Sequence, residues 1–366
     1  MGLNFKILHT ADWHLGHPRV KTQDTSDNIR EFLFPRIPDV KLLVIAGDIF
    51  DGRISFNSPD TSVIIDLFVD LLKLCYTNNV VVRIVRGTYS HDILQNNVVT
   101  KLYGKLGLQI DFRVINDLSV ESIESLGITL LFIPDNLPFK DKRALLRSAA
   151  DIMTASDITQ VDYVVMHGEF DILNYGNLGR NIYTLSDFDK ICKYLVLSGH
   201  IHKPQRAGKL IYSGSINRLA HNEEEAKGYW IVQETSAEFV ENTDSTLFLT
   251  FDYTKISTLK EALVKYSEDI LQFGSKHGYF RIVIDDIHIR QALLLHHLPL
   301  YPNIRLTFKA SKRKETSQKY LDDKIKEITE IREVPTSKNI SSIVAQYLET
   351  EMGVCMDLSD IEMIIN

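Results

Sequence analysis

One stretch, Lys41-Leu-Leu-Val-Ile-Ala-Gly-Asp-Ile-Phe-Asp51, decides the fold. The residues from Lys41 to Ala46 are mostly apolar and partly β-branched, which predicts a buried strand that Gly47 ends. Asp48 therefore follows the carboxyl end of a strand, where open α/β sheets build their sites. A carboxylate buried there must be hydrogen-bonded, paired or bound to a metal. Asp51 is a candidate to hold neighbouring ligands in place, although the motif alone also fits a capped turn.

Four more predicted strands also end in side chains that can bind metal ions. The strands Phe5–His9, Val80–Val85, Val161–Met166 and Tyr194–Leu197 precede Asp12-x-His14, Ser90-His91-Asp92, His167-Gly-Glu169 and Gly199-His-x-His202, respectively. Carboxylates with imidazoles suit a divalent transition metal such as manganese, iron or zinc. Singly, these motifs also fit a capping acid beside a surface histidine, or a structural histidine. Their recurrence at successive strand ends favours a metal site.

Composition narrows the class of protein. The chain has 366 residues, 44% of them hydrophobic and 24% charged, as in ordinary globular proteins. A net charge of −7 argues against coating nucleic acid through bulk charge, but leaves DNA open as a substrate. No apolar run reaches the roughly 18–20 residues of a membrane span, and the N-terminus lacks a signal-peptide layout. Cys75, Cys192 and Cys355 form no Cys-x-x-Cys, so we expect reduced thiols in a cytoplasmic protein.

The pattern of elements predicts an α/β fold in three parts. Residues 1–235 alternate predicted strands with helices at Ser62–Tyr76 and Asp141–Ile152. Residues 245–310 carry no ligand-rich strand ends and predict a small α+β domain. Its expected strands and helices are Thr246–Phe251, Thr258–Phe273, Tyr279–Ile284, Ile289–His296 and Ile304–Phe308.

Residues 311–366 predict a polar linker, Ser311–Thr316, and a helical tail. The tail places apolar residues at helical spacing, namely Ile325, Ile328, Ile343, Val344, Tyr347 and Leu348. An apolar face of this kind either binds a partner or packs on its own domain. The residues leave both possibilities open.

The five strand-end motifs occur in the order and approximate spacing of the calcineurin-like metallophosphoesterases. The flanking segments His9-Thr-Ala-Asp-Trp-His-Leu-Gly16 and Tyr212-Ser-Gly-Ser-Ile-Asn-Arg-Leu219, followed by an acidic stretch and Lys227-Gly, narrow the resemblance. They resemble the SbcD-type nucleases, called meiotic-recombination-eleven in eukaryotes, and phage exonuclease small subunits share the pattern. The resemblance is strong over roughly residues 5–232. Beyond them only the architecture is similar, with a capping domain and a partner-binding tail.

The resemblance implies a β-sandwich flanked by helices, with two divalent metal ions that share one aspartate. The first ion would be held by Asp12, His14, Asp48 and His202, and the second by Asp48, His167 and His200. Two ions roughly 3.5–4 Å apart can clamp both oxygens of a phosphodiester displacement and lower the pKa of water. The mixed oxygen and nitrogen ligands favour Mn²⁺, with Mg²⁺ as the alternative.

Three further residues are candidates for catalysis. His91 is placed to protonate the leaving sugar oxygen as a general acid. We expect Asp92, beside it in sequence, to fix its tautomer and raise its pKa, and Asp51 to support the ligands.

One motif departs from the family. Where the family has Gly-Asn-His followed by Asp or Glu, this chain has Gly87-Thr-Tyr-Ser-His-Asp92, which is two residues longer. Ser90 or Thr88 would then replace the amide ligand of the second ion. Since a hydroxyl is a weaker ligand than an amide oxygen, we expect a looser second site.

These features predict a DNA exonuclease or endonuclease subunit that acts at double-stranded ends and on single strands. By resemblance it would work as a homodimer with an SbcC-type coiled-coil ABC ATPase in DNA repair, recombination or replication. A stand-alone metallophosphatase or small-molecule phosphodiesterase is the alternative, but it would need neither cap nor tail. Because the family's Asn is missing, a third interpretation is a non-catalytic scaffold. The remaining ligands are all intact, which disfavours it.

Overall fold

The computed structural model describes residues 2–55, 57–92, 95–135, 137–171, 182–273, 278–297 and 304–310. By its contacts the chain divides into two units, Met1–Ala310 and Ser311–Asn366. The predicted linker, the helical tail and Cys355 fall in the second unit and lie outside the described residues. The descriptions below concern the first unit.

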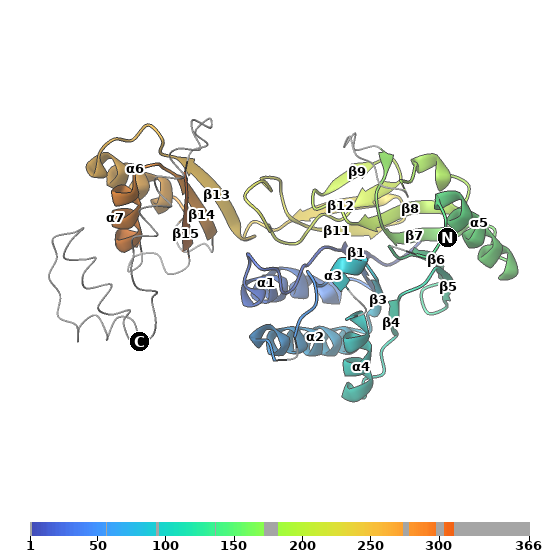
Figure 1. The fold of residues 1–366 in the computed structure, drawn as a ribbon. Helices are drawn as coiled ribbons and strands as arrows, with labels where there is room; N and C mark the ends of the chain where they lie inside the picture. Colours follow the sequence, from blue (N-terminus) through green and yellow to red (C-terminus); the bar gives the residue numbers. More distant parts are fainter. Residues whose placement is uncertain are drawn as a thin grey trace, which may run out of the picture. The chain divides into compact units, whose positions relative to one another are not determined.

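Two six-stranded sheets form the main body of this unit (Figure 1). The first sheet contains, in spatial order, β12 (Ser236–Glu241), β11 (Gly228–Gln233), β1 (Ile7–Thr10), β2 (Leu42–Ala46), β3 (Val81–Val85) and β4 (Phe112–Ile115). The second contains β5 (Ser119–Ile123), β6 (Ile128–Ile133), β7 (Val161–His167), β8 (Cys192–Gly199), β10 (Leu210–Tyr212) and β9 (Gln205–Ala207). Strands β1 to β4 run parallel, as do β6, β7, β8 and β10.

Both faces of the first sheet are buried, as its apolar strands require. Along β2, Leu42 and Val44 pack into the core between the two sheets, whereas Leu43 and Ile45 pack into the core under the helices. This alternation follows from the two-residue period of a strand. It explains why the run from Leu42 to Ala46 is apolar throughout.

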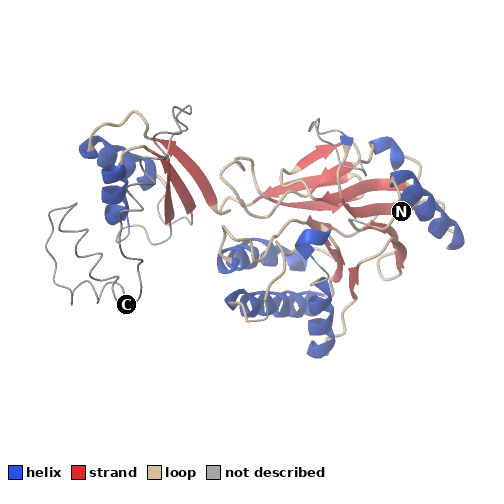
Figure 2. Ribbon diagram, viewed as in Figure 1, coloured by secondary structure: helices blue, strands red, loops and turns tan. Residues whose placement is uncertain are grey.

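Helices cover the outer faces of the two sheets (Figure 2). On the first sheet lie α1 (Thr22–Asn28), a π turn (Ile29–Leu33), a 3₁₀ turn (Phe34–Asp39), α2 (Pro59–Asn78) and α4 (Asn96–Leu106). Helix α5 (Lys142–Ala155) covers the second sheet, α3 (Tyr89–Asp92) is a single turn after β3, and Leu185–Asp187 forms a 3₁₀ turn. Ser58 caps α2 by accepting a hydrogen bond from Asp60 N at 3.2 Å, and Pro59 occupies its first turn.

The third sheet has three parallel strands, β13 (Leu247–Asp252), β14 (Gly278–Val283) and β15 (Ile304–Lys309). Helices α6 (Leu259–Leu271) and α7 (Ile287–His297) alternate with them and share a separate core. Phe248 and Tyr279 stack with their centroids 4.7 Å apart and contact Val20 and Leu219 of the main body. This sheet falls within the predicted segment 245–310, whose boundaries and capping role stay predictions.

A charged side chain lies in the middle of β3. The Arg83 side chain is 1% exposed and donates to both carboxylate oxygens of Glu121, at 2.7 and 2.9 Å, and to Asp111 Oδ1 at 2.7 Å. Its Nη1 atom also donates to the carbonyls of Val82 and Asp111. The guanidinium is therefore fully engaged, which is the condition under which an arginine can be buried in a sheet.

The predicted α/β fold, with sheets flanked by helices, is confirmed. The strands that precede all five ligand motifs are present, each shifted by no more than a few residues. Among the described residues, no helix has the length and apolar character needed to cross a membrane. Cys75 and Cys192 are buried and free, as expected.

Candidate metal centre

The loops after β1, β2, β3, β7 and β8 converge at the carboxyl edges of the two main sheets. Asp12 N donates to Gly47 O at 3.0 Å and His14 N to Asp48 O at 3.1 Å, so the first two loops continue side by side. A Cβ atom on Gly47 would collide with the His167 ring, and one on Gly87 would collide with the backbone of Asp48. Glycine at these two positions lets the loops approach closely enough for their side chains to meet.

Several predicted ligands have left-handed backbone conformations. Asp12, His14, Asp48 and His200 have φ angles of 53°, 47°, 50° and 86°. Among the described non-glycine residues only three others, Asn79, Asp157 and Glu234, have positive φ. Such conformations cost free energy and cluster at functional sites. The concentration of four of them here is independent support for a functional centre.

The first ligand group contains Asp12, His14 and His202, with candidate donor atoms within 4.8 Å of one another. The Nε2 atoms of the two histidines are 3.0 Å apart. Their Nδ1 atoms lie 2.9 Å from Asp51 Oδ1 and 3.1 Å from Glu223 Oε1, respectively. Because a carboxylate accepts a hydrogen bond, both Nδ1 atoms donate to their carboxylates, which turns the two Nε2 atoms toward each other. A cation between them satisfies this arrangement, so the donors fit a metal ion.

The second ligand group contains Asp48, His167 and His200. His167 Nδ1 donates to Ala46 O at 2.7 Å, which leaves Nε2 facing Asp48 Oδ2 at 3.2 Å. The same Asp48 oxygen lies 3.9 Å from His14 Nε2 in the first group. Asp48 therefore stands between the two groups, where the family resemblance implies a shared ligand.

The charges of this centre attract a cation. Burial alone would lower the pKa of His167, but the Asp48 carboxylate more than offsets this and raises it to about 10. Burial alone would raise the pKa of Asp48, yet His167 holds it well below its usual range. The pair thus favours a positive charge beside Asp48, and a divalent ion could supply that charge in place of a proton.

Of the two candidate hydroxyls, the structure brings only that of Thr88 to this group. Thr88 N donates to Asp48 Oδ1 at 2.6 Å, and Thr88 Oγ1 lies 3.2 Å from Asp48 Oδ2 and 3.3 Å from His167 Nε2. Ser90 is exposed on α3. Thr88 is therefore the better placed of the two candidates, because the turn of α3 leaves Ser90 exposed to solvent. Which of them binds the ion stays a prediction.

Asp92 has a structural role that the sequence did not predict. It is fully buried, and its oxygens accept hydrogen bonds from Phe50 N at 3.2 Å, Gly87 N at 2.7 Å and Asn96 Nδ2 at 3.0 Å. It thereby ties the loops after β2 and β3 together. Its described contacts include none with His91, so the predicted orienting role of Asp92 stays a prediction.

The carboxylate beside His91 is that of Asp51. His91 Nδ1 lies 3.7 Å from Asp51 Oδ1, and this neighbour raises the pKa of His91. The His91 ring stands perpendicular to that of His14, with centroids 4.9 Å apart. His91 is 33% exposed, so it can reach a substrate. Asp51 thus contacts both a ligand and the candidate acid.

Two residues near the ligands received no role from sequence reasoning. Glu169 Oε1 lies 3.2 Å from His200 Nε2, and Glu223 contacts His202. Glu169 was visible in the His167-Gly-Glu motif, whereas Glu223 is one of three consecutive glutamates. Only the fold distinguishes Glu223 from the other two.

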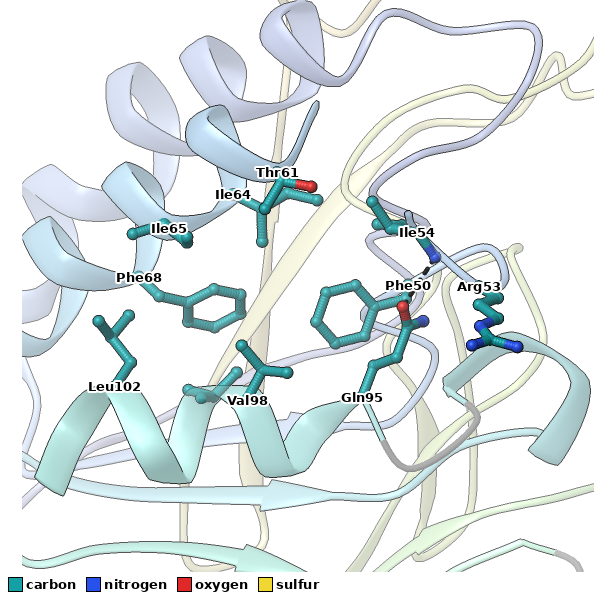
Figure 3. Close-up of a pocket in the computed structure, with 11 residues that line it drawn as sticks. Phe50, Arg53, Ile54, Thr61, Ile64, Ile65, Phe68, Gln95, Val98 and Leu102 are labelled. Carbon is teal, nitrogen blue, oxygen red and sulfur yellow. Dashed lines mark hydrogen bonds between the residues drawn. The ribbon is translucent and has the colours of Figure 1, made fainter. Parts of the chain in front are cut away.

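An apolar cavity of about 450 Å³ lies behind the loop that follows β2 (Figure 3). Phe50 and Ile54 of this loop face side chains from α2 and α4, among them Phe68 and Val98. Gln95 closes one end and fixes the loop, accepting from Ile54 N at 2.7 Å and donating to Gly52 O at 2.6 Å. No ligand of either group lines this cavity, so it takes no direct part in the metal centre.

Comparison with known proteins agrees with this geometry. Residues 5–204 match the calcineurin-like phosphoesterase family. The chain is also 24% identical over 335 residues to the SbcD component of the SbcCD nuclease from Staphylococcus saprophyticus, covering 81% of this chain and 83% of that protein. The protein of the same name from Staphylococcus epidermidis is 24% identical over 334 residues, which cover 82% and 84% of the two chains.

Proposed function

We infer that this chain, which belongs to the calcineurin-like phosphoesterase family, is a metal-dependent nuclease subunit that hydrolyses phosphodiester bonds at DNA ends. The observation that carries the inference is the pair of ligand groups with Asp48 between them. Similarity to two SbcCD nuclease components over about four fifths of the chain supports DNA as the substrate. Roles in DNA repair, recombination or replication follow from that similarity.

The described residues divide the work of hydrolysis. We assign Asp12, His14, Asp48 and His202 to a first ion, and Asp48, His167, His200 and Thr88 to a second, with Mn²⁺ favoured by the mixed donors. Bound ions neutralise phosphate charge and lower the pKa of water. Asp51 holds His14 through Nδ1. With Nδ1 turned to Asp51, His91 offers Nε2 to protonate the leaving sugar oxygen.

The test is Mn²⁺-dependent digestion of linear duplex DNA and of single strands, with and without an SbcC-type ATPase. We expect cleavage that is lost when a chelator is added and restored by Mn²⁺. A protein that hydrolyses p-nitrophenyl phosphate but no DNA would instead be a phosphatase. A protein that binds two ions and cleaves neither would be a scaffold.

The second ion is expected to bind more weakly than the first. Thr88→Val keeps the backbone N–H bond to Asp48 but removes the hydroxyl 3.3 Å from His167. It should lower the affinity for the second ion by about 10-fold or more. Ser90→Ala is the matched control, because Ser90 is exposed. Calorimetric titration with Mn²⁺ gives both affinities. Two equally tight sites in the parent, or a loss of Mn²⁺ affinity with Ser90→Ala, would contradict the assignment.

We propose that residues 245–310 cap the DNA and that residues 311–366 bind the base of the ATPase coiled coil. The apolar positions of the tail, such as Ile343 and Tyr347, suit a helix laid into a groove, since burial yields roughly 25 cal/mol per Å². Deletion after Lys309 should abolish co-purification with the ATPase. Mn²⁺-dependent cleavage of a short single strand should survive. Retained co-purification would mean that the tail belongs to its own fold.

We also propose that two copies associate, through the face between α2 and α4. Val98 is 51% exposed at the mouth of the apolar cavity there, and Val98→Glu would place a charge on that face. Light scattering should show a dimer for the parent and a monomer for Val98→Glu. Thr100→Glu, an exposed position on the same helix, is the control for added charge.

The buried, free thiols of Cys75 and Cys192 fit a cytoplasmic location.

A further inference from the structure

Lys227 is a fully buried lysine beside the first ligand group. Its side chain is 0% exposed, although lysine is almost never buried without partners. Its Nζ atom donates to Glu223 Oε2 at 2.7 Å, Glu225 Oε1 at 2.8 Å and the carbonyl oxygen of His202 at 3.0 Å. An ammonium group has three donors, and each has an acceptor here. Lys227 is thus unavailable to DNA phosphates, and its role must lie within the protein.

Glu223 connects this lysine to a predicted ligand. While Oε2 accepts from Lys227 Nζ and from Leu219 N at 3.2 Å, Oε1 lies 3.1 Å from His202 Nδ1. The carboxylate is therefore held on one side by an ammonium and a backbone amide, and presents its other oxygen to the imidazole. Lys227 also contacts this histidine directly, because its Nζ atom donates to the backbone carbonyl of His202. Side chain and backbone of His202 are both fixed by one buried charge.

We propose that Lys227 and Glu223 form a positioning pair that holds His202 as the Nδ1–H tautomer, with its Nε2 lone pair directed at the first ion. This proposal rests on the proposed function. Two carboxylates face one ammonium, so the cluster keeps a negative charge beside the ring and strengthens Nε2 as a donor. Carboxylate partners of this kind orient metal-binding histidines and typically contribute 10- to 100-fold in affinity.

The two ligand groups differ in this support. In the first group His14 and His202 are both backed by carboxylates, those of Asp51 and Glu223. In the second group only His200 contacts a carboxylate, that of Glu169, and His167 is backed by the carbonyl of Ala46. Carboxylate-backed rings are better donors. The pair thus accounts for a tighter first site, and its loss should affect one ion selectively.

Glu223→Gln in the full-length chain tests the proposal. The amide keeps the volume of the side chain, but its NH₂ group must face either Lys227 or His202. Facing His202, it makes Nδ1 an acceptor and moves the ring proton to Nε2, toward the ligand group. Glu224→Gln is the matched control, since Glu224 is the exposed neighbour. Lys227→Met leaves two carboxylates unpaired and is expected to destabilise the fold, so Glu223→Gln carries the test.

Two measurements decide the outcome. Calorimetric titration with Mn²⁺ should show that Glu223→Gln lowers the affinity of the tighter site by 10- to 100-fold. The affinity of the weaker site should not change, and Glu224→Gln should bind both ions as the parent does. Imidazole ¹⁵N spectra of the chelator-treated chain should show the Nδ1–H tautomer of His202 in the parent and Nε2–H in Glu223→Gln, a change that a merely structural role would not produce. Unchanged affinity, or an unchanged tautomer, would overturn the proposal.

Failure of the proposed function is recognisable separately. A parent chain that binds two ions without cleaving DNA would refute the nuclease assignment, while the affinities still decide the role of the pair. A parent chain that binds no ion would overturn both proposals.

Discussion

His91→Ala should reduce DNA cleavage by about 10²- to 10⁴-fold, the usual contribution of a general acid, without loss of either ion. His91 lies outside the groups Asp12/His14/His202 and Asp48/His167/His200 that we assign to the two ions. Its own cluster, with His14 and Asp51, contains the carboxylate that faces it. His91 stands 33% exposed beside the two groups, with Asp51 raising its pKa and so favouring a protonated ring. Single-turnover rates and metal content per chain measure the two effects. His288→Ala, an exposed histidine on α7, is the control.

The leaving group provides a sharper test of this role. When a p-nitrophenyl ester of thymidine phosphate is hydrolysed, the leaving group is p-nitrophenolate, which departs without a proton. His91→Ala should therefore cleave this ester with little defect. An equal defect on DNA and on this ester would show that His91 acts by positioning rather than as an acid. Loss of an ion with an unchanged rate would contradict the assignment altogether.

Arg83→Met should destabilise the fold by about 3–5 kcal/mol, because it removes the buried partner of a largely buried carboxylate and leaves it only a solvent-exposed arginine. The Glu121 side chain is only 13% exposed, and both its oxygens bind Arg83. Arg113→Met is the matched control. Arg113 also binds Glu121, at 2.8 Å, but is 61% exposed, and such pairs contribute about 0–1 kcal/mol. Urea unfolding at neutral pH measures both; similar losses in the two variants would contradict the expected effect of burial.

The difference in stability between the parent and Arg83→Met should depend on pH. Burial alone would raise the pKa of Glu121, but its bonds to Arg83 and Arg113 lower it below the unfolded value. A carboxyl group with a depressed pKa in the folded state stabilises the fold above its unfolded pKa of about 4.3. That stabilisation is lost as the pH falls through the folded pKa. The gap between parent and Arg83→Met should therefore be widest near neutral pH and narrow below about pH 4.

Buried strands were the most predictable part of this fold. Runs such as Leu42 to Ala46 are apolar on both faces, so they are recognisable without periodicity, and glycine marks where they end. Helix α1 was missed because Thr22–Asn28 contains no apolar residue and is stabilised only by its surroundings. Helix α4 begins with two asparagines and includes Gly104, which weakens its helical pattern.

Pairings between distant residues were the least predictable part of the site. Sequence neighbours suggested Asp92 as the partner of His91, but successive residues of a helical turn point about 100° apart. The described neighbour, Asp51, comes from another loop. Similarly, nothing in the run Glu223-Glu-Glu225 singles out the residue that reaches His202. The choice of Thr88 over Ser90 also depends on the turn of α3.

The left-handed backbone of Asp12, His14, Asp48 and His200 sets the stability of the fold against its chemistry. Each such residue costs about 1–2 kcal/mol relative to a relaxed backbone, although aspartate tolerates this conformation better than histidine. Together they use a sizeable fraction of the roughly 5–15 kcal/mol that holds a domain folded. Glycine at any of the four would relieve strain while deleting a ligand. Random mutation followed by selection for thermostability alone would therefore tend to erode this centre first, and only selection for activity keeps it.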